Sequence, residues 1–127
     1  MAQGFGPCVL AASLLTRERD MFKSIDDIKK ANKALGHHWF DRDTMEFFRS
    51  RLDSGVMHDE AGNTYFVSSE RENEWSERMY SIRVANEVGD VTTLGGFMVF
   101  TSASEAWEAI EEHIEHMDAY YKCNACQ

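Results

Sequence analysis

The spacing of the apolar residues changes twice along this chain and divides it into three parts. Between residues 24 and 55 they recur every three or four positions, which is the period of a helix. From Val56 to Phe100 they tend to alternate with polar residues, which is the period of a strand. After Ser102 the helical period returns. The pattern therefore predicts two helices, a sheet and a last helix.

The first helix has signals at both of its ends. Ser24 and Asp27 form an S-x-x-D capping signal, in which a side-chain oxygen accepts from a free N–H group of the first turn. Leu35 is followed by Gly36, and glycine takes the left-handed conformation of a helix C-cap without a steric penalty. Residues 37–40, His-His-Trp-Phe, form a short link that we expect to pack against the core.

The second helix is predicted to run from Arg42 to Leu52, with Asp41 as its N-cap. Met45 and Phe48 lie at helical spacing along it and are expected to be buried together with Leu52. The link is so short that the two helices must be neighbours.

The middle of the chain contains several segments with strand character. They are Val56–His58, Thr64–Ser68, Met79–Ala85, Val91–Leu94 and, after a bend at Gly95-Gly96, Phe97–Phe100. The charged segment Glu70–Glu77 is expected to be an exposed loop. The predicted fold is α+β, with helices covering one face of an antiparallel sheet of about four strands.

The last helix is predicted to be amphipathic. Ser102 and Glu105 form a capping box at its start. Its apolar stripe consists of Trp107, Ile110, Ile114, Met117 and Tyr121. Its outward side carries Glu108, Glu111, Glu112, Glu115 and Asp118.

The length of the chain and the positions of its cysteines limit the possible domain organisation and cellular compartment. The 127 residues fit one domain, which we place at residues 21–121, with 1–20 as an appended segment and 122–127 as a tail. The apolar stretch Phe5–Leu15 is a weak targeting candidate, because Pro7 interrupts it and no basic residue precedes it. The three cysteines all lie near the termini, which favours a reducing cytoplasm over a secreted scaffold.

Charge is distributed unevenly around a net value of −9. Residues 1–55 include nine basic and eight acidic residues, whereas residues 56–127 include four basic and fourteen acidic residues. Affinity for nucleic acid comes largely from Lys and Arg, so this balance argues against a general phosphate-binding surface. An acidic lobe suits a basic protein partner, or serves solubility alone.

Signals for metal binding and catalysis are weak. A zinc site has one candidate set, with the spacing H-x2-H-x6-C-x2-C: His113, His116, Cys123 and Cys126. A continuous helix would hold the two pairs apart, so the helix would have to break near Tyr120. The chain has no G-x-S-x-G motif, P-loop or dinucleotide fingerprint. We therefore expect no metal, no cofactor and no enzymatic activity.

The segment from Lys29 to Ser69 resembles a family of small phage- and plasmid-borne proteins of uncharacterised function. Their pattern is close to KANKxxGHHFFDxxTMRFFxSR, then YFVTSE, then a strand R-x-Y-x-[IV]-R, which corresponds here to Arg78–Arg83. The resemblance covers most of residues 25–115. It implies a phage or mobile-element setting and names no reaction.

Two functions follow as expectations. The first is a non-enzymatic accessory protein that binds a host protein in the bacterial cytoplasm, for example as an anti-CRISPR-like inhibitor that occupies a basic, nucleic-acid-binding surface. Its expected contact residues are Glu108, Glu111, Glu112, Glu115, Asp118, Glu70, Glu72 and Glu74. The alternative is a small nucleic-acid-binding regulator. It would use Lys29, Lys30, Lys33, Arg42, Arg49 and Arg51.

Overall fold

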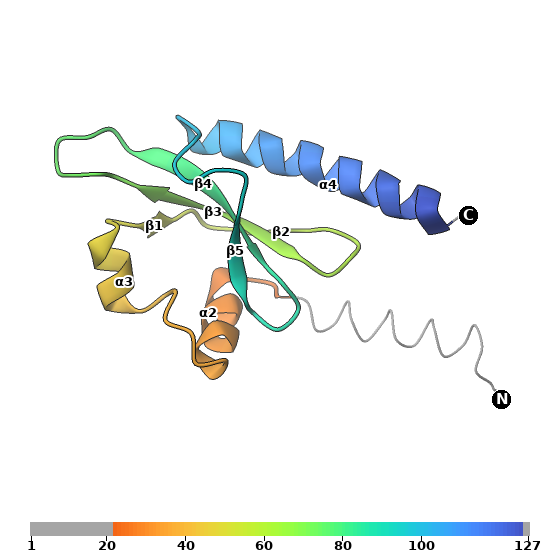
Figure 1. The fold of residues 1–127 in the computed structure, drawn as a ribbon, viewed down its shortest axis with the longest axis horizontal. Helices are drawn as coiled ribbons and strands as arrows, with labels where there is room; N and C mark the ends of the chain where they lie inside the picture. The colour runs from red at the N-terminus through yellow and green to blue at the C-terminus, as the bar shows by residue number, and fades with distance from the viewer. Residues whose placement is uncertain (1–21, 126–127) are drawn as a thin grey trace.

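The computed structural model describes residues 22–125, with side chains as far as Tyr120. Three helices and five strands follow one another along the chain (Figure 1). They are α2 (Ile25–Ala34), α3 (Arg42–Phe47), β1 (Arg51–Leu52), β2 (Met57–His58), β3 (Thr64–Glu70), β4 (Met79–Ala85), β5 (Val91–Leu94) and α4 (Ala103–Ala125). The fold is therefore α+β, as predicted. The expectations for residues 1–20 lie outside the described residues.

The strands form one antiparallel sheet in the order β1-β3-β4-β5. The short strand β2 pairs with the start of β3, and β1 pairs with its end. The central pair is in register from Thr64↔Ala85 to Glu70↔Met79. Strand β1 is an addition to the predicted set, whereas the predicted strand Phe97–Phe100 reduces to a single bridge between Phe100 and Tyr80.

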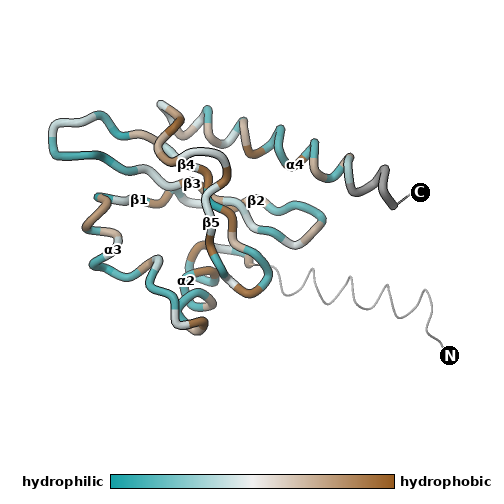
Figure 2. The backbone as a smooth tube through the Cα atoms, in the orientation of Figure 1, coloured by the Kyte–Doolittle hydropathy of each residue, from teal (hydrophilic) through white to brown (hydrophobic). Residues whose placement is uncertain are grey.

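Helices cover both faces of the sheet, so the prediction that they cover one face is wrong. Tyr65 and Val67 of β3 pack with Ile110 of α4 on one face. Phe66, between them in sequence, packs with Ile28 of α2 on the other face. All seven residues of β3 are buried, because alternate side chains point to opposite faces and each face has its own cover. Figures 1 and 2 show α4 on one side of the strands and α2 and α3 on the other.

Helix α2 begins and ends as its sequence predicts. Ser24 Oγ accepts from the Asp27 backbone N–H at 3.3 Å. Gly36, which follows the C-cap Leu35, has a φ of 84°. The buried Asn32 side chain donates to the Gly89 carbonyl at 2.9 Å and thereby ties the helix to the β4–β5 turn.

Helix α3 is shorter than predicted. It ends at Phe47 because Arg49 takes a left-handed φ of 52° and Ser50 N–H donates back to the Met45 carbonyl at 2.8 Å. This is a Schellman-type C-cap, with arginine where glycine is usual. Asp41 is the N-cap residue, as predicted, but its carboxylate makes no cap hydrogen bond and instead lies 2.7 Å from Nδ1 of the His38 ring.

Helix α4 starts at the predicted cap, where Ser102 Oγ accepts from the Glu105 backbone N–H at 3.2 Å. It then continues without a break to Ala125. Trp107 lies on its inner side, and its indole N–H donates to the Asp53 carboxylate at 2.7 Å. This hydrogen bond joins α4 to the loop that follows β1.

Candidate functional site

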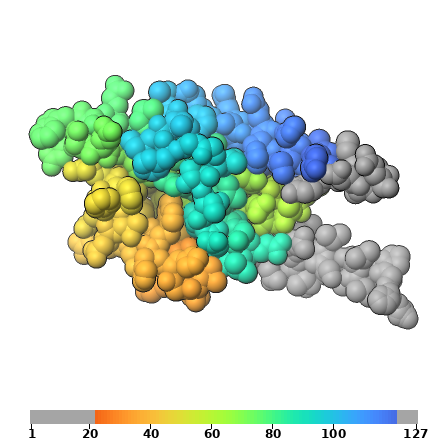
Figure 3. Space-filling model, in the orientation of Figure 1, coloured from red at the N-terminus to blue at the C-terminus, as the bar shows by residue number. Residues whose placement is uncertain are grey.

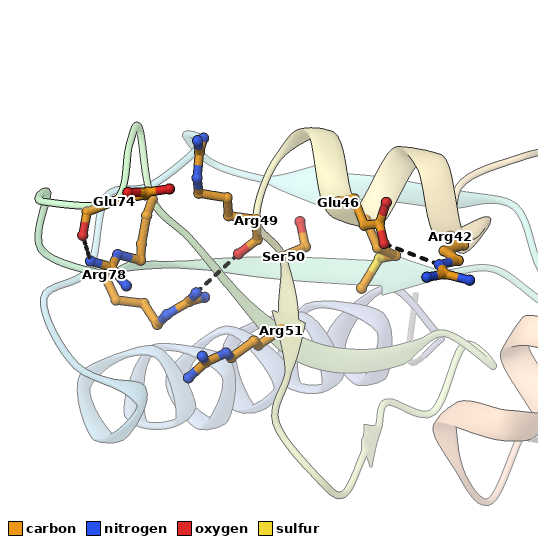
Figure 4. Close-up of a pocket in the computed structure, with 9 residues that line it drawn as sticks. Arg42, Glu46, Arg49, Ser50, Arg51, Glu74 and Arg78 are labelled. Carbon is orange, nitrogen blue, oxygen red and sulfur yellow. Dashed lines mark hydrogen bonds and ion pairs between the residues drawn. The ribbon is translucent and has the colours of Figure 1, made fainter.

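A pocket lined by arginines lies where α3, β1 and the β3–β4 loop meet. Its volume is about 450 Å³. It is lined by Arg42, Met45, Glu46, Arg49, Ser50, Arg51, Arg71, Glu74 and Arg78. Five arginines thus surround one hollow in a chain with a net charge of −9. We refer to it as the arginine pocket (Figure 4).

Two segments that are distant in sequence build this pocket. One segment runs from the start of α3 to β1 and supplies Arg42, Arg49 and Arg51, and residues 71–78 supply the remaining two arginines. Figure 3 shows the first segment, in yellow, beside the 71–78 loop, in green. The left-handed turn at Arg49 sends the chain from α3 straight into β1, and β1 pairs with the end of β3. The early end of α3 is therefore what brings the arginines together.

Hydrogen bonds to main-chain carbonyls hold three of these arginines. Arg49 Nη1 donates to Glu72 O at 3.2 Å, and Arg71 Nε donates to Ser76 O at 3.0 Å. Arg78 Nη2 donates to Arg49 O at 3.0 Å (Figure 4). Carbonyl groups satisfy N–H donors without cancelling charge, so the positive charge of these side chains stays in the pocket.

The electrostatics of the pocket favour an anion. Burial lowers the pKa of Arg78, and the positive charges of Arg51 and Arg71 lower it further. Glu46, one of the two glutamates in the lining, is paired with Arg42 at 3.0 Å. A bound phosphate or carboxylate would relieve the repulsion among the arginines through charge-assisted hydrogen bonds.

A second cavity, of about 340 Å³, adjoins the arginine pocket. It is lined by Trp39, Thr44, Met45, Phe48, Ser50, Arg83, Thr93 and Phe97. We call it the aromatic cavity, because three rings form its walls.

Arg83, which lines the aromatic cavity, belongs to a buried ion pair. Arg83 Nη2 lies 3.3 Å from Glu70 Oε2, and the two side chains are 9% and 1% exposed. Burial lowers the pKa of Arg83, and the Glu70 carboxylate opposes that shift. Arg83 also donates to Ser68 at 2.8 Å and to Thr93, so strands β3, β4 and β5 share this network.

Aromatic rings enclose the Arg83 guanidinium. Its carbon lies 4.9 Å from the Trp39 ring centroid and 5.3 Å from that of Phe97. Such contacts are cation–π interactions. Phe48, which is partly exposed, lies 6.1 Å from Phe97 and extends the wall toward solvent.

Two further aromatic side chains stand exposed beside the cavities. Phe47 is 76% exposed and contacts Phe48 at a centroid distance of 4.8 Å. Trp75, in the 71–78 loop, is 87% exposed. Large exposed rings next to a pocket mark a surface where binding would bury apolar area.

The predicted basic residues divide into two groups. Arg42, Arg49 and Arg51 gather in the arginine pocket, whereas the predicted Lys29, Lys30 and Lys33 lie exposed on α2 and do not line it. Sequence reasoning did not select Arg71, Arg78 or Arg83 as site residues. Arg78 and Arg83 belong to the R-x-Y-x-I-R motif, whose two arginines were the available signal.

The predicted acidic residues are also divided. Glu108, Glu111, Glu112 and Glu115 are exposed on α4, as are Glu72 and Glu74 in the 71–78 loop. Asp118 is partly buried and accepts from the Glu60 backbone N–H at 3.1 Å. The placement of Glu70 in an exposed loop is wrong. Glu70 ends β3 and is buried because Arg83, Ser50 and Ser81 all donate to its carboxylate.

Nothing in the described part of the chain resembles a metal site. No group of three or more His, Cys, Asp or Glu side chains within it is arranged to hold an ion. Helix α4 lacks the break near Tyr120 that the zinc hypothesis requires, and the side chains of Cys123 and Cys126 lie outside the described residues. None of the helices described is both long enough and apolar enough to cross a membrane.

The fold and site define a small α+β domain with helices on both faces of the sheet and an arginine-lined pocket at its edge. The chain belongs to the family of unknown function DUF7447, which it matches over residues 24–111. That match includes every residue that lines the two cavities and ends within α4, before Glu112. Comparison with curated proteins and with solved structures gave no match.

Proposed function

We propose that this protein is a non-enzymatic accessory protein of a phage or mobile element that binds an anionic partner through the arginine pocket. The arrangement of the five arginines carries this proposal. Arg49, Arg71 and Arg78 donate to carbonyl groups, so their charge is available to a ligand. Binding would be favoured further by exposed rings such as Trp75, because arginine and tryptophan are the residues most enriched at binding hot spots.

The lining of both cavities supports binding over catalysis. Among the described residues, neither lining contains a histidine or a cysteine. General acid–base catalysis works best with a group that titrates near neutral pH, and arginine does not. The buried carboxylate of Glu70 is committed to Arg83 and to two serine hydroxyls.

A second candidate function uses the opposite charge. The acidic side of α4 would occupy a basic surface of a host defence protein that targets nucleic acid, in the manner of an anti-CRISPR inhibitor. Its support is a row of exposed carboxylates along a 23-residue helix: Glu108, Glu111, Glu112 and Glu115. The arginine pocket is favoured over this row because it lies wholly within the family match, whereas Glu112 and Glu115 lie outside it.

Affinity capture with two matched variants separates these candidates. The tagged chain is incubated with bacterial lysate, and both captured protein and captured nucleic acid are identified. One variant carries Arg49→Gln and Arg71→Gln, and the other carries Glu→Gln at positions 108, 111, 112 and 115. We expect the first to lose the partner and the second to retain it, with thermal melting as the check that both fold. The reverse pattern would favour the acidic helix, and retention by both would refute both surfaces.

A further inference from the structure

The arginine pocket and the aromatic cavity are two parts of one binding surface. Met45 and Ser50 line both of them, so the two hollows meet at the end of α3. One hollow is positive and the other is aromatic. A ligand that fills both must therefore carry a negative group next to a flat one.

The aromatic cavity suits a flat ring with polar edges. Its volume of about 340 Å³ is within the range of small-ligand sites, which begins near 300 Å³. Trp39, Phe48 and Phe97 line it, and the Arg83 guanidinium lies over the Trp39 and Phe97 rings. A flat ligand would stack against the ring faces that Arg83 leaves uncovered. Arg83 and Thr93 place polar groups at the floor, and a guanidinium has five N–H donors, of which Arg83 uses three within the protein.

We propose that these two cavities bind a nucleotide unit of a single-stranded nucleic acid, with its phosphate among the arginines and its base in the aromatic cavity. The inference rests on the proposed function and names its anionic partner. Arginine recognises phosphate through bidentate, charge-assisted hydrogen bonds. Base stacking on aromatic side chains beside a positive groove is the general mode of single-strand binding.

The surroundings favour a single strand over a duplex. Phe47 on α3 and Trp75 in the 71–78 loop are exposed on the two segments that build the arginine pocket, where they would be available to stack neighbouring bases. In a duplex the faces of the bases are covered by the neighbouring base pairs, so the bases cannot stack on these side chains. A duplex also needs an extended basic surface, whereas the five arginines here gather in one pocket of a chain with a net charge of −9.

The test measures binding of labelled strands by fluorescence anisotropy at two salt concentrations. The probes are a short oligothymidylate, an abasic phosphodiester strand of the same length, and a duplex. We expect the wild-type chain to bind oligothymidylate at least about tenfold more tightly than either of the others, since each stacked base contributes on the order of five- to a hundredfold.

Three double variants then assign the two parts of the site. Phe48→Ala with Phe97→Ala should weaken oligothymidylate binding about fivefold or more, the loss expected for one stacked base, and leave abasic binding unchanged. Arg49→Gln with Arg71→Gln should weaken both strands about tenfold or more and reduce the salt dependence. Lys29→Gln with Lys33→Gln removes the same charge from the exposed side of α2 and should change neither.

Each result decides a separate claim. Both phenylalanines are about half exposed, so their variants should fold, and melting curves are the check. Equal affinity for the oligothymidylate and abasic strands would overturn the base site, and equal affinity for duplex would overturn the preference for a single strand. If no strand binds even at low salt, the nucleotide inference is wrong. The arginine pocket is then judged by the capture experiment alone, where a captured protein lost in the Arg49/Arg71 variant would still support it.

Discussion

The ion pair beneath the aromatic cavity allows a quantitative prediction about stability. In Glu70→Leu, the Arg83 guanidinium would remain buried without its counter-charge, because its side chain is only 9% exposed. Removing one partner of a buried pair typically costs about 3–5 kcal/mol. The Ser50 and Ser81 hydroxyls would also lose their acceptor, but they can turn toward other groups. We therefore expect Glu70→Leu to lower the free energy of unfolding by about 3–5 kcal/mol.

The double variant Glu70→Leu/Arg83→Met provides the matched control. It removes both charges and fills the space with apolar side chains, which is often close to neutral. Urea unfolding followed by circular dichroism gives the free energies of the wild type, both single variants and the double variant. The double variant should recover at least about 2 kcal/mol relative to the sum of the single losses, as expected for residues in direct contact. A loss below about 1 kcal/mol in Glu70→Leu would show that Arg83 finds water or another partner, and the buried network would be refuted.

Two smaller predictions test the elements that position the site. Arg49 has a left-handed φ of 52°, so Arg49→Gly should be more stable than Arg49→Ala by about 1 kcal/mol, and equal urea midpoints for the two variants would contradict this backbone assignment. Trp107→Phe removes the 2.7 Å hydrogen bond to Asp53 while retaining an aromatic ring on α4, and should lower the free energy of unfolding by about 1.5–3 kcal/mol. An unchanged unfolding midpoint would mean that this hydrogen bond does not stabilise the packing of α4 on the sheet.

Features set by neighbouring residues were predictable from the sequence. The cap at Ser24 and the stop at Gly36 placed α2 within a residue or two, and Ser102 placed the start of α4. The alternation from Met79 to Ala85 gave β4 with its observed bounds. Each of these signals acts within one or two turns of helix, or along one strand, and needs no knowledge of the rest of the fold.

Features that depend on distant residues were not predictable. Strand β1 has two residues and exists only because Arg51 and Leu52 pair with Ser69 and Ser68. The burial of Glu70 depends on Arg83, thirteen residues further along the chain. The end of α3 is a local feature that also lacked a signal, because Arg49 takes a conformation that glycine usually supplies. The apolar spacing therefore predicted a helix as far as Leu52.

The arginine pocket shows why net charge alone did not predict a positive site. Its five arginines come from two segments that carry no cluster of basic residues in sequence, and Glu46 and Glu74 stand among them. Only the β1–β3 pairing and the 71–78 loop make them neighbours. A negative total charge is therefore compatible with a strongly positive site, because screening at physiological salt limits charge interactions to about 8 Å.

The separation of charge across the sheet also bears on specificity. The acidic residues of α4 lie on one side of the sheet, whereas α3 and the arginine pocket are associated with the other face and its edge. A long polyanion that approaches at random meets mainly negative surface and is repelled. In the proposed binding mode, a ligand would gain attraction when it places an anionic group within a few ångströms of the arginines, and it would gain stacking only if a free ring can enter beside them. Repulsion by the acidic surface would thus act against non-specific binding to duplex nucleic acid. Specificity for a single strand would then depend on this repulsion as well as on attraction in the pocket.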